Sequence, residues 1–378
     1  MKFRYIALFA LILPAISNAV ELRPLPSPPI IGSTSYLVVD SKTGAEIASL
    51  EPDKAVAPAS LTKLMTAYVV FHALNEGQIA LEDLVTVSEK AWRAEGSRMF
   101  IEVGKRVSVE DLLLGMIVQS GNDASIALAE HVAGSESVFA EIMNQYALAL
   151  GMLSSHFMNS TGLPNDNHYS TARDLATLAR AIVNEFPVYY KWYSVKEFTY
   201  NNIKQPNRNN LLWRDDSIDG MKTGRTDAAG YCLVSSAERD GMRIVSVVLG
   251  TASAKARIDG SQALINYAFR FFETRLLYEA GKEITRARIW KSANEYSSLG
   301  VLEDLHITVQ RGAYDLLEST MNMPAVIEAP VAAGQPLAEL QVTLDGQTVL
   351  TESLRALEDN PDGSLWQKAR DSIGLIFE

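Results

Sequence analysis

The chain has 378 residues and a formal net charge of −11, with 47% hydrophobic and 21% charged residues. That length exceeds what one hydrophobic core usually organises, so we expect a larger domain accompanied by a smaller one. The acidic balance has no compensating basic patch, which argues against nucleic acid as a partner. Cys232 is the only cysteine, so no internal disulfide is possible, and its apolar neighbours indicate a buried structural thiol.

The N-terminus has the pattern of a secretory signal peptide. Lys2 and Arg4 precede an apolar run over Tyr5–Ile16, and residues 17–19 supply the small side chains of a cleavage site. The apolar run is shorter than the roughly 20 residues that a transmembrane helix needs. We therefore assign residues 1–19 to a signal peptide and expect the chain to be exported.

Two early segments predict the opening elements of the larger domain. Tyr36–Val39 and Ala45–Ala48 flank a turn-like segment, which predicts a β-hairpin. Residues 60–75 carry apolar side chains at helical spacing and stop just before Gly77. We expect a largely buried helix there, beginning at Ser60.

Two further helices are expected after a capping signal. Ser108, with Asp111 three residues later, resembles a capping box before a helix over Leu112–Val118. A second helix is predicted over Ala124–Val132. The stretch between them, residues 119–122, is expected to be non-helical.

The next part of the chain changes to strand character. Met221–Gly224, Tyr231–Ala237 and Ile244–Leu249 are β-prone runs separated by turns, and we expect them to be antiparallel neighbours. An amphipathic helix that reaches Phe272 follows. Gly281 then marks the predicted end of the larger domain.

The remaining chain predicts a small domain and a terminal helix. Between residues 281 and 358, short apolar runs alternate with Gly, Pro and Asn turns, which is typical of an all-β sandwich. In residues 359–378 the apolar side chains fall on one side of a helix, and these are Leu365, Trp366, Ala369, Ile373, Ile376 and Phe377. The predicted fold class is therefore an antiparallel sheet flanked by helices over residues 20–280, followed by the β domain and the amphipathic helix.

Ser60-Leu61-Thr62-Lys63 is an S-x-x-K tetrad at the start of the predicted buried helix. The spacing places Lys63 one turn after Ser60 on the same helix face, so the amine can reach the hydroxyl. The helix N-terminus favours the negative charge that develops during acyl transfer. One such tetrad arises by chance about once per chain of this length, so the neighbouring motifs decide its meaning.

Two further motifs follow in the required order. Ser120-Gly121-Asn122 lies between two predicted helices and Lys222-Thr223-Gly224 lies on a predicted strand, which together with S-x-x-K is the motif set of penicillin-recognising serine enzymes. Similar strings at residues 42–44 and 292–294 lack this order. No G-x-S-x-G elbow and no metal-ligand spacing of His or Cys occurs, so we predict no Ser-His-Asp site, no metal and no cofactor.

At these motifs the sequence resembles the low-molecular-mass penicillin-binding proteins of the type-five D-alanyl-D-alanine carboxypeptidase family, over nearly the whole chain. Matching stretches include Pro58–Thr66, Asn122–Ala124, Tyr169–Ala172, Asp219–Gly224 and Phe269–Thr274. The resemblance implies a serine-type D-Ala-D-Ala carboxypeptidase that removes the terminal D-alanine from peptidoglycan pentapeptide stems. It also implies acylation by β-lactam antibiotics and a role in cell-wall synthesis and cell shape.

The reaction implied by the resemblance runs through an acyl-enzyme on Ser60. Lys63, if neutral, takes the hydroxyl proton, and burial, the helix N-terminus and the nearby cation Lys222 would all lower its pKa. Ser120 would relay a proton to the departing D-alanine. Asn122 would hydrogen-bond the peptide backbone of the substrate.

Other residues are candidates for substrate binding. The resemblance places the oxyanion hole on the backbone N–H groups of Ser60 and Arg225. The free carboxylate of the substrate needs cations and hydroxyls, so Lys222 and the K-T-G hydroxyl are expected to contact it, with two arginines that the resemblance places nearby. The substrate-binding candidates are thus Thr223, Gly224, Arg225, Arg257 and Arg208. His168, in a loop bordering the site, is expected to be structural.

The resemblance also implies a location. The terminal helix would lie on the outer face of the inner membrane, in the periplasm, with Trp366 and Phe377 at the level of the lipid headgroups. The helix is too short and too polar to span the bilayer. A competing interpretation is that it packs on the β domain.

Three other functions share the motifs or the fold. A class A serine β-lactamase adds a glutamate base in the loop after the second motif, whereas this chain has no glutamate between Glu141 and Glu185. A non-catalytic scaffold that binds peptidoglycan stems would not need all three motifs. An endopeptidase that cuts crosslinks would use the same motifs, and the sequence does not separate it from a carboxypeptidase.

Overall fold

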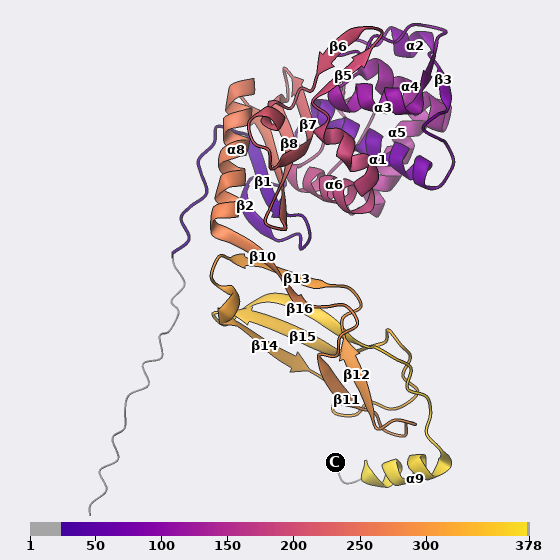
Figure 1. Ribbon diagram of the computed structural model, residues 1–378, viewed down its shortest axis with the longest axis vertical. Coiled ribbons are helices and arrows are strands. Elements are labelled where there is room, and N and C mark those ends of the chain that lie inside the picture. The colour runs from indigo at the N-terminus through magenta and orange to yellow at the C-terminus, as the bar shows by residue number, and fades with distance from the viewer. Residues whose placement is uncertain (1–23, 376–378) are drawn as a thin grey trace, which may run out of the picture.

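The computed structural model describes residues 24–375, so the predicted signal peptide, Ile376 and Phe377 lie outside the described residues. Figure 1 shows a helix-rich domain followed by a β domain, with a short helix at the far end of the β domain. No helix among residues 24–375 is long and apolar enough to cross a membrane.

The first domain is built around an antiparallel sheet with the strand order β2-β1-β9-β8-β7. Its strands are β1 (Ser35–Asp40), β2 (Glu46–Leu50), β7 (Ile218–Thr226), β8 (Gly230–Arg239) and β9 (Met242–Thr251). The predicted hairpin and the three predicted later strands are confirmed. Because β7 is an edge strand, one side of the strand that carries the K-T-G motif is free of sheet partners.

Helices cover both faces of this sheet. One face meets α1 (Thr62–Asn75), α3 (Val109–Val118), α4 (Asn122–Ala133), α5 (Glu136–Ala149) and α6 (Ala172–Glu185), and the other meets α8 (Ala254–Phe271). An apolar core lies on each face of the sheet, and successive side chains of β1 point alternately into one core and the other. Leu37 and Val39 pack in the core on the side of α1, whereas Tyr36 and Val38 pack with α8 on the other side.

The first domain also contains short elements. They are the 3-10 turn η1 (Ala59–Leu61), η2 (Lys191–Ser194), η3 (Asn210–Trp213), α2 (Glu89–Trp92), α7 (Pro187–Tyr190), and the strand pairs β3 (Leu84–Thr86) with β4 (Arg106–Ser108) and β5 (Glu197–Tyr200) with β6 (Ile203–Pro206).

The helix starts differ from the predictions in two places. The helix expected from Ser60 begins at Thr62, because Ala59 has a left-handed φ of 49° and the chain enters α1 through the tighter turn η1. Asn122, expected in a non-helical stretch, is the first residue of α4. The predicted cap is confirmed, since the Ser108 hydroxyl accepts a hydrogen bond from Asp111 N at 3.1 Å.

The β domain contains a pair of strands and a larger sheet around a shared apolar core. The pair is β10 (Phe272–Tyr278) with β13 (Leu305–Gln310), and the larger sheet has the order β11 (Thr285–Arg288), β12 (Tyr296–Gly300), β16 (Gln347–Ala356), β15 (Pro336–Leu344) and β14 (Leu317–Asn322), with the turn η4 (Tyr314–Leu316) before β14. Phe272, predicted to close a helix, opens β10 because its backbone is extended. Strand pairing therefore starts the β domain upstream of the boundary predicted at Gly281.

The terminal helix α9 (Leu365–Gly374) begins with a capping box at Ser364. Asp371 attaches it to the β domain, because the carboxylate accepts a hydrogen bond from Lys291 N at 2.7 Å. Its large apolar side chains remain outside this contact, with Leu365 87%, Trp366 86% and Ile373 61% exposed. The helix therefore contacts the β domain through polar groups and through Gly374, which lies close to the Trp290 ring, and leaves Leu365, Trp366 and Ile373 exposed.

Candidate active site

The predicted nucleophile lies in a turn that is held from both sides. Ser60 follows Ala59, whose left-handed φ of 49° is uncommon for a residue with a side chain. On one side, a Cβ on Gly162 would lie 1.8 Å from Ala59 O. On the other, a Cβ on Gly224 would lie 3.0 Å from Pro58 O. Glycine in the K-T-G motif therefore lets β7 lie directly against the nucleophile turn.

Lys63 is the centre of the site. Its side chain is 1% exposed, and Nζ lies 3.1 Å from Ser60 Oγ. Nζ donates hydrogen bonds to Asn122 Oδ1 and to the main-chain oxygen of Thr161, each at 2.7 Å. A neutral amine has two hydrogens and one lone pair, so these two acceptors leave the lone pair for the Ser60 hydroxyl.

The environment of Lys63 favours that neutral form. Burial, assisted by the positive charge of Arg208, lowers the pKa of Lys63 to about 7, while the carboxylates of Asp123 and Glu136 act in the opposite direction. A base with this pKa is substantially deprotonated at neutral pH and still accepts a proton readily.

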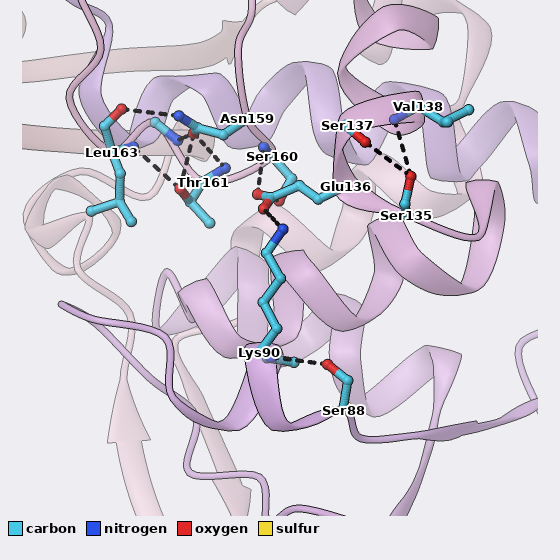
Figure 2. A network of polar contacts seen from close by, with 12 residues as sticks. Ser88, Lys90, Ser135, Glu136, Ser137, Val138, Asn159, Ser160, Thr161 and Leu163 are labelled. Atoms are coloured by element: carbon cyan, nitrogen blue, oxygen red, sulfur yellow. Dashed lines mark hydrogen bonds and ion pairs between the residues drawn. The ribbon is translucent and has the colours of Figure 1, made fainter.

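A polar network holds the carbonyl that Lys63 uses (Figure 2). Asn159 Oδ1 accepts hydrogen bonds from Thr161 N at 3.2 Å and Gly162 N at 2.7 Å. Glu136 Oε1 accepts from Ser160 N and Oγ, and Glu136 Oε2 is 2.8 Å from Lys90 Nζ. Burial alone would raise the pKa of Glu136, but the bonds from Lys90 and Ser160 outweigh it and lower that pKa. Glu136 is therefore an ionised support of the loop.

The second motif pairs with the third. Ser120, between α3 and α4, has a left-handed φ of 65° and is buried. Its hydroxyl accepts a hydrogen bond from Lys222 Nζ at 2.8 Å, and Lys222 Nζ also donates to Thr223 O at 3.1 Å. Burial and the neighbouring cations Lys63, Arg208 and Arg257 lower the pKa of Lys222. The site thus contains two serine-lysine pairs.

Asn122 joins Lys63 to the loop that contains Glu95. Its Nδ2 donates to Glu95 O at 2.6 Å, which orients Oδ1 toward Lys63. One hydrogen on Nδ2 is left for a substrate carbonyl. The next residue, Asp123, holds the same loop, because its carboxylate accepts from Met99 N and Phe100 N, each at 2.9 Å.

The structure brings both candidate arginines to the site. Arg257 lies in the first turn of α8 and is 7% exposed, with Nη1 3.4 Å from Cys232 O and Nε without a partner among residues 24–375. Arg208 is exposed, and its Nε donates to Gln119 O at 2.9 Å. The Arg225 side chain is exposed and pairs with Asp227 at 3.1 Å, so only its backbone N–H remains a candidate for the oxyanion hole.

Three contributors had no motif that marked them. The Thr161 carbonyl is a main-chain group, Glu136 acts through the loop, and Asp123, although it lies in the matching stretch Asn122–Ala124, had no role assigned to it. His168 has the expected structural place, since its Nε2 is 2.8 Å from Thr62 Oγ1 and burial lowers its pKa to about 4. No cluster of His, Cys, Asp and Glu in the described part of the chain could hold a metal ion.

This geometry defines a class of protein. A serine hydroxyl beside a buried, deprotonable lysine, faced by a second serine-lysine pair on an edge strand, is the constellation of serine acyl-transfer enzymes of the β-lactamase and DD-peptidase type.

Comparison with known proteins identifies the family. The family description "D-alanyl-D-alanine carboxypeptidase" matches residues 24–253, and "Penicillin-binding protein 5, C-terminal domain" matches residues 272–361. The chain belongs to the D-alanyl-D-alanine carboxypeptidase family and is a serine-type carboxypeptidase of the penicillin-binding protein group.

Individual relatives agree with this family. D-alanyl-D-alanine carboxypeptidase DacA of Escherichia coli is 39% identical, covering 93% of this chain and 90% of that protein. The Haemophilus influenzae DacA is 38% identical, covering 100% and 98%. The crystal structure of penicillin-binding protein 5 from Haemophilus influenzae matches with a TM-score of 0.87 and 41% identity, over 89% of this chain and 100% of that one.

Proposed function

We propose that Ser60 is the acylated nucleophile of a D-Ala-D-Ala carboxypeptidase acting on peptidoglycan pentapeptide stems. The observation that carries this assignment is Lys63, whose buried Nζ lies 3.1 Å from Ser60 Oγ and is bound to two acceptors that leave its lone pair free. The same hydroxyl would attack β-lactams. A related protein from Listeria monocytogenes, 30% identical with a TM-score of 0.59, over 63% of this chain and 98% of that one, is described in its ampicillin-bound form.

In the first step Ser60 Oγ bonds to the carbonyl carbon of the penultimate D-alanine while Lys63 takes the hydroxyl proton. The developing oxyanion would be stabilised by the backbone N–H groups of Ser60 and Arg225. The C–N bond then breaks, and the departing amine receives a proton through Ser120, which is held by Lys222. Water subsequently hydrolyses the ester and restores the hydroxyl.

Three cations of the site, Lys222, Arg208 and Arg257, lie close to one another and could bind the terminal carboxylate of the substrate. Lys222 is at the strand, and the charges of Arg208 and Arg257 both act on it. Arg257 also has a buried Nε without a partner among residues 24–375, a group that costs free energy unless a ligand satisfies it. These three cations favour a peptide that ends in a free carboxylate over one whose C-terminus is neutral.

Hydrolysis of β-lactams as the main activity finds less support. The segment between Glu141 and Glu185, which includes the loop that joins α5 and α6, has no glutamate to serve as the added base of class A β-lactamases. Glu136 reaches that loop from α5, but its oxygens are engaged by Lys90 and Ser160. An endopeptidase remains a second candidate, because a Pseudomonas aeruginosa D-alanyl-D-alanine endopeptidase is 34% identical over 62% of this chain and 78% of that protein.

We also propose that the mature chain lies in the periplasm with α9 in the outer surface of the inner membrane. Exposed Leu365, Trp366 and Ile373 support this proposal, since such side chains enter the interface between headgroups and acyl chains.

Labelled penicillin tests the assignment of the nucleophile. Peptide mapping should find the label on Ser60, and Ser60→Ala should abolish labelling while the variant keeps its melting temperature. Label on another serine would refute the assignment.

A further inference from the structure

A cavity of about 630 Å³ lies where the two domains join. It is lined by the end of β8, the last turns of α8, the start of β10 and the residue after β13, which meet at the junction in Figure 1. Helix α8 runs from the active site to this cavity, with Arg257 in its first turn and Arg270 near its end. At a rise of about 1.5 Å per residue, these two residues are about 20 Å apart.

Four arginines line the cavity, and two of them are already paired. Arg239 Nη2 donates to Asp215 Oδ2 at 2.5 Å, and Arg275 Nη2 pairs with Glu273 Oε2 at 3.0 Å. Their charges are thus largely neutralised within the protein.

The other two arginines are not neutralised in this way. Arg311 Nη2 donates to the main-chain carbonyls of Phe269 at 2.9 Å and Phe272 at 3.2 Å, which orient the guanidinium without cancelling its charge. Arg270 lies over the ring of Phe271, 5.6 Å from the centroid, and has no hydrogen bond or ion pair within residues 24–375.

The acidic residues that line the cavity do not neutralise the charges of both Arg270 and Arg311. Glu273 faces Arg311 as well as Arg275, so one carboxylate is set against two guanidinium groups. Asp240, exposed at the turn between β8 and β9, is the other acid that lines the cavity. In a chain with net charge −11, the cavity lining is locally positive, because it has four arginines and two acidic residues.

The volume and the apolar lining of the cavity limit the kind of ligand that can bind there. A volume of about 630 Å³ is in the range of small-molecule sites, and buried Met242 and Phe269 supply apolar surface. Guanidinium groups bind planar oxyanions in a bidentate manner. A carboxylate on a short peptide fits both the charge and the apolar surface.

We propose that the junction cavity binds the free carboxylate of a second, already trimmed stem peptide of the same polymer. This inference rests on the proposed function, because every stem that loses its terminal residue still ends in a carboxylate. Holding one such end about 20 Å from the active-site end of α8 raises the local concentration of neighbouring untrimmed stems at Ser60.

The test compares two substrates of the full mature chain, a single pentapeptide stem and a soluble polymer fragment with several stems. Arg270→Gln removes an exposed charge that has no hydrogen bond to lose. We expect it to raise the KM for the polymer by roughly twofold to fivefold, the scale of one screened ion pair, and to leave hydrolysis of the single stem unchanged. The difference should disappear in about 1 M salt.

Arg106→Gln is the matched control, because Arg106 is an exposed arginine on β4 outside the cavity, and its side chain likewise has no hydrogen bond or ion pair within residues 24–375. Equal KM values for Arg270→Gln and the control on the polymer would overturn the proposal. Calorimetric titrations with a trimmed tetrapeptide and with inorganic phosphate show whether the cavity binds a peptide carboxylate or a free anion. If phosphate binds and the tetrapeptide does not, the proposal is also overturned. Failure of the wild-type chain to cleave even the single stem would instead refute the proposed function.

Discussion

At the scale of single residues, the proposed chemistry depends on a neutral Lys63. Its Nζ has two fixed acceptors and one hydroxyl neighbour, an arrangement suited to a neutral amine. The charges around it oppose one another, because Arg208 lowers its pKa whereas Asp123 and Glu136 raise it. The balance gives a pKa of about 7.

This balance predicts the pH dependence of acylation. The base must be unprotonated, so the rate of acylation by penicillin should rise as the pH increases through about 7 and then level off. Asp123→Asn removes a charge that raises the pKa of Lys63, so the rise should move to lower pH. Arg208→Gln removes a charge that lowers it, so the rise should move to higher pH.

Stopped-flow acylation over a range of pH measures both shifts. Glu110→Gln, which changes an exposed carboxylate on α3, should leave the profile unmoved. Shifts of the same sign in Asp123→Asn and Arg208→Gln would contradict the role given to Lys63.

Arg257 predicts selectivity for a free acid. Arg257→Ala should slow hydrolysis of a peptide ending in a carboxylate more than that of its C-terminal amide, because a charge-assisted contact is lost only with the acid. We expect the selectivity ratio to fall by on the order of tenfold, measured as kcat/KM for the two peptides. An equal loss on both would indicate that the variant merely disturbs the packing around Cys232.

At the scale of elements, loops hold the helix and strand that carry the motifs. The loop from Asn159 to Gly162 supplies the Thr161 carbonyl to Lys63 and packs against Ala59, the residue before Ser60. Glycine is required at residue 162 both by its φ of +81° and by the absence of room for a Cβ.

Gly162→Ala should therefore lower the melting temperature and the acylation rate together. Gly77→Ala is the control, because Gly77 also has a positive φ, +69°, but a Cβ there would meet nothing within 4 Å. Both variants incur a backbone cost of about 1 kcal/mol, and only Gly162→Ala adds a clash with the nucleophile turn. Equal losses in thermal denaturation and unaltered acylation in both would show that the loop does not support the site.

The elements that sequence predicts well are those with a local cause. Periodic apolar residues, β-branched runs and the Ser108 cap predict α1, the strands β7 to β9 and the start of α3. The turn η1 was not predictable, because the left-handed φ of Ala59 is imposed by the loop and the strand packed around it. The Thr161 carbonyl could not be predicted from the sequence either, because every residue has a main-chain carbonyl and no residue type marks the one that is used.

At the scale of the whole molecule, two features of the region where the domains meet depend on residues far apart in the sequence. The predicted boundary at Gly281 follows turn chemistry, whereas β10 already pairs with β13 of the β domain. The Lys42-Thr43-Gly44 string, which mimics a catalytic motif, lies at the domain contact, where Thr43 Oγ1 is 2.6 Å from Thr308 Oγ1. Such pairings over long sequence separations have no local pattern.

The exposed face of α9 predicts binding to membranes. Mature chain should bind liposomes that contain anionic lipid, and a chain ending at Pro361 should not, while both hydrolyse a soluble pentapeptide equally. Trp366→Ser should weaken binding, whereas Tyr296→Ser, which changes an exposed aromatic on β12, should not. Equal binding by the full and shortened chains in a sedimentation assay would contradict the anchor.

The most direct test of the central claim is mass spectrometry of a pentapeptide ending in D-Ala-D-Ala after incubation with the mature chain. We expect a product lighter by one alanine residue, and no product with Ser60→Ala. Lys63→Ala should reduce the rate by on the order of 100-fold or more, the usual effect of losing a general base. An intact pentapeptide after incubation with the folded wild-type chain, or undiminished cleavage by Ser60→Ala, would contradict the assignment of Ser60 as the nucleophile of a carboxypeptidase.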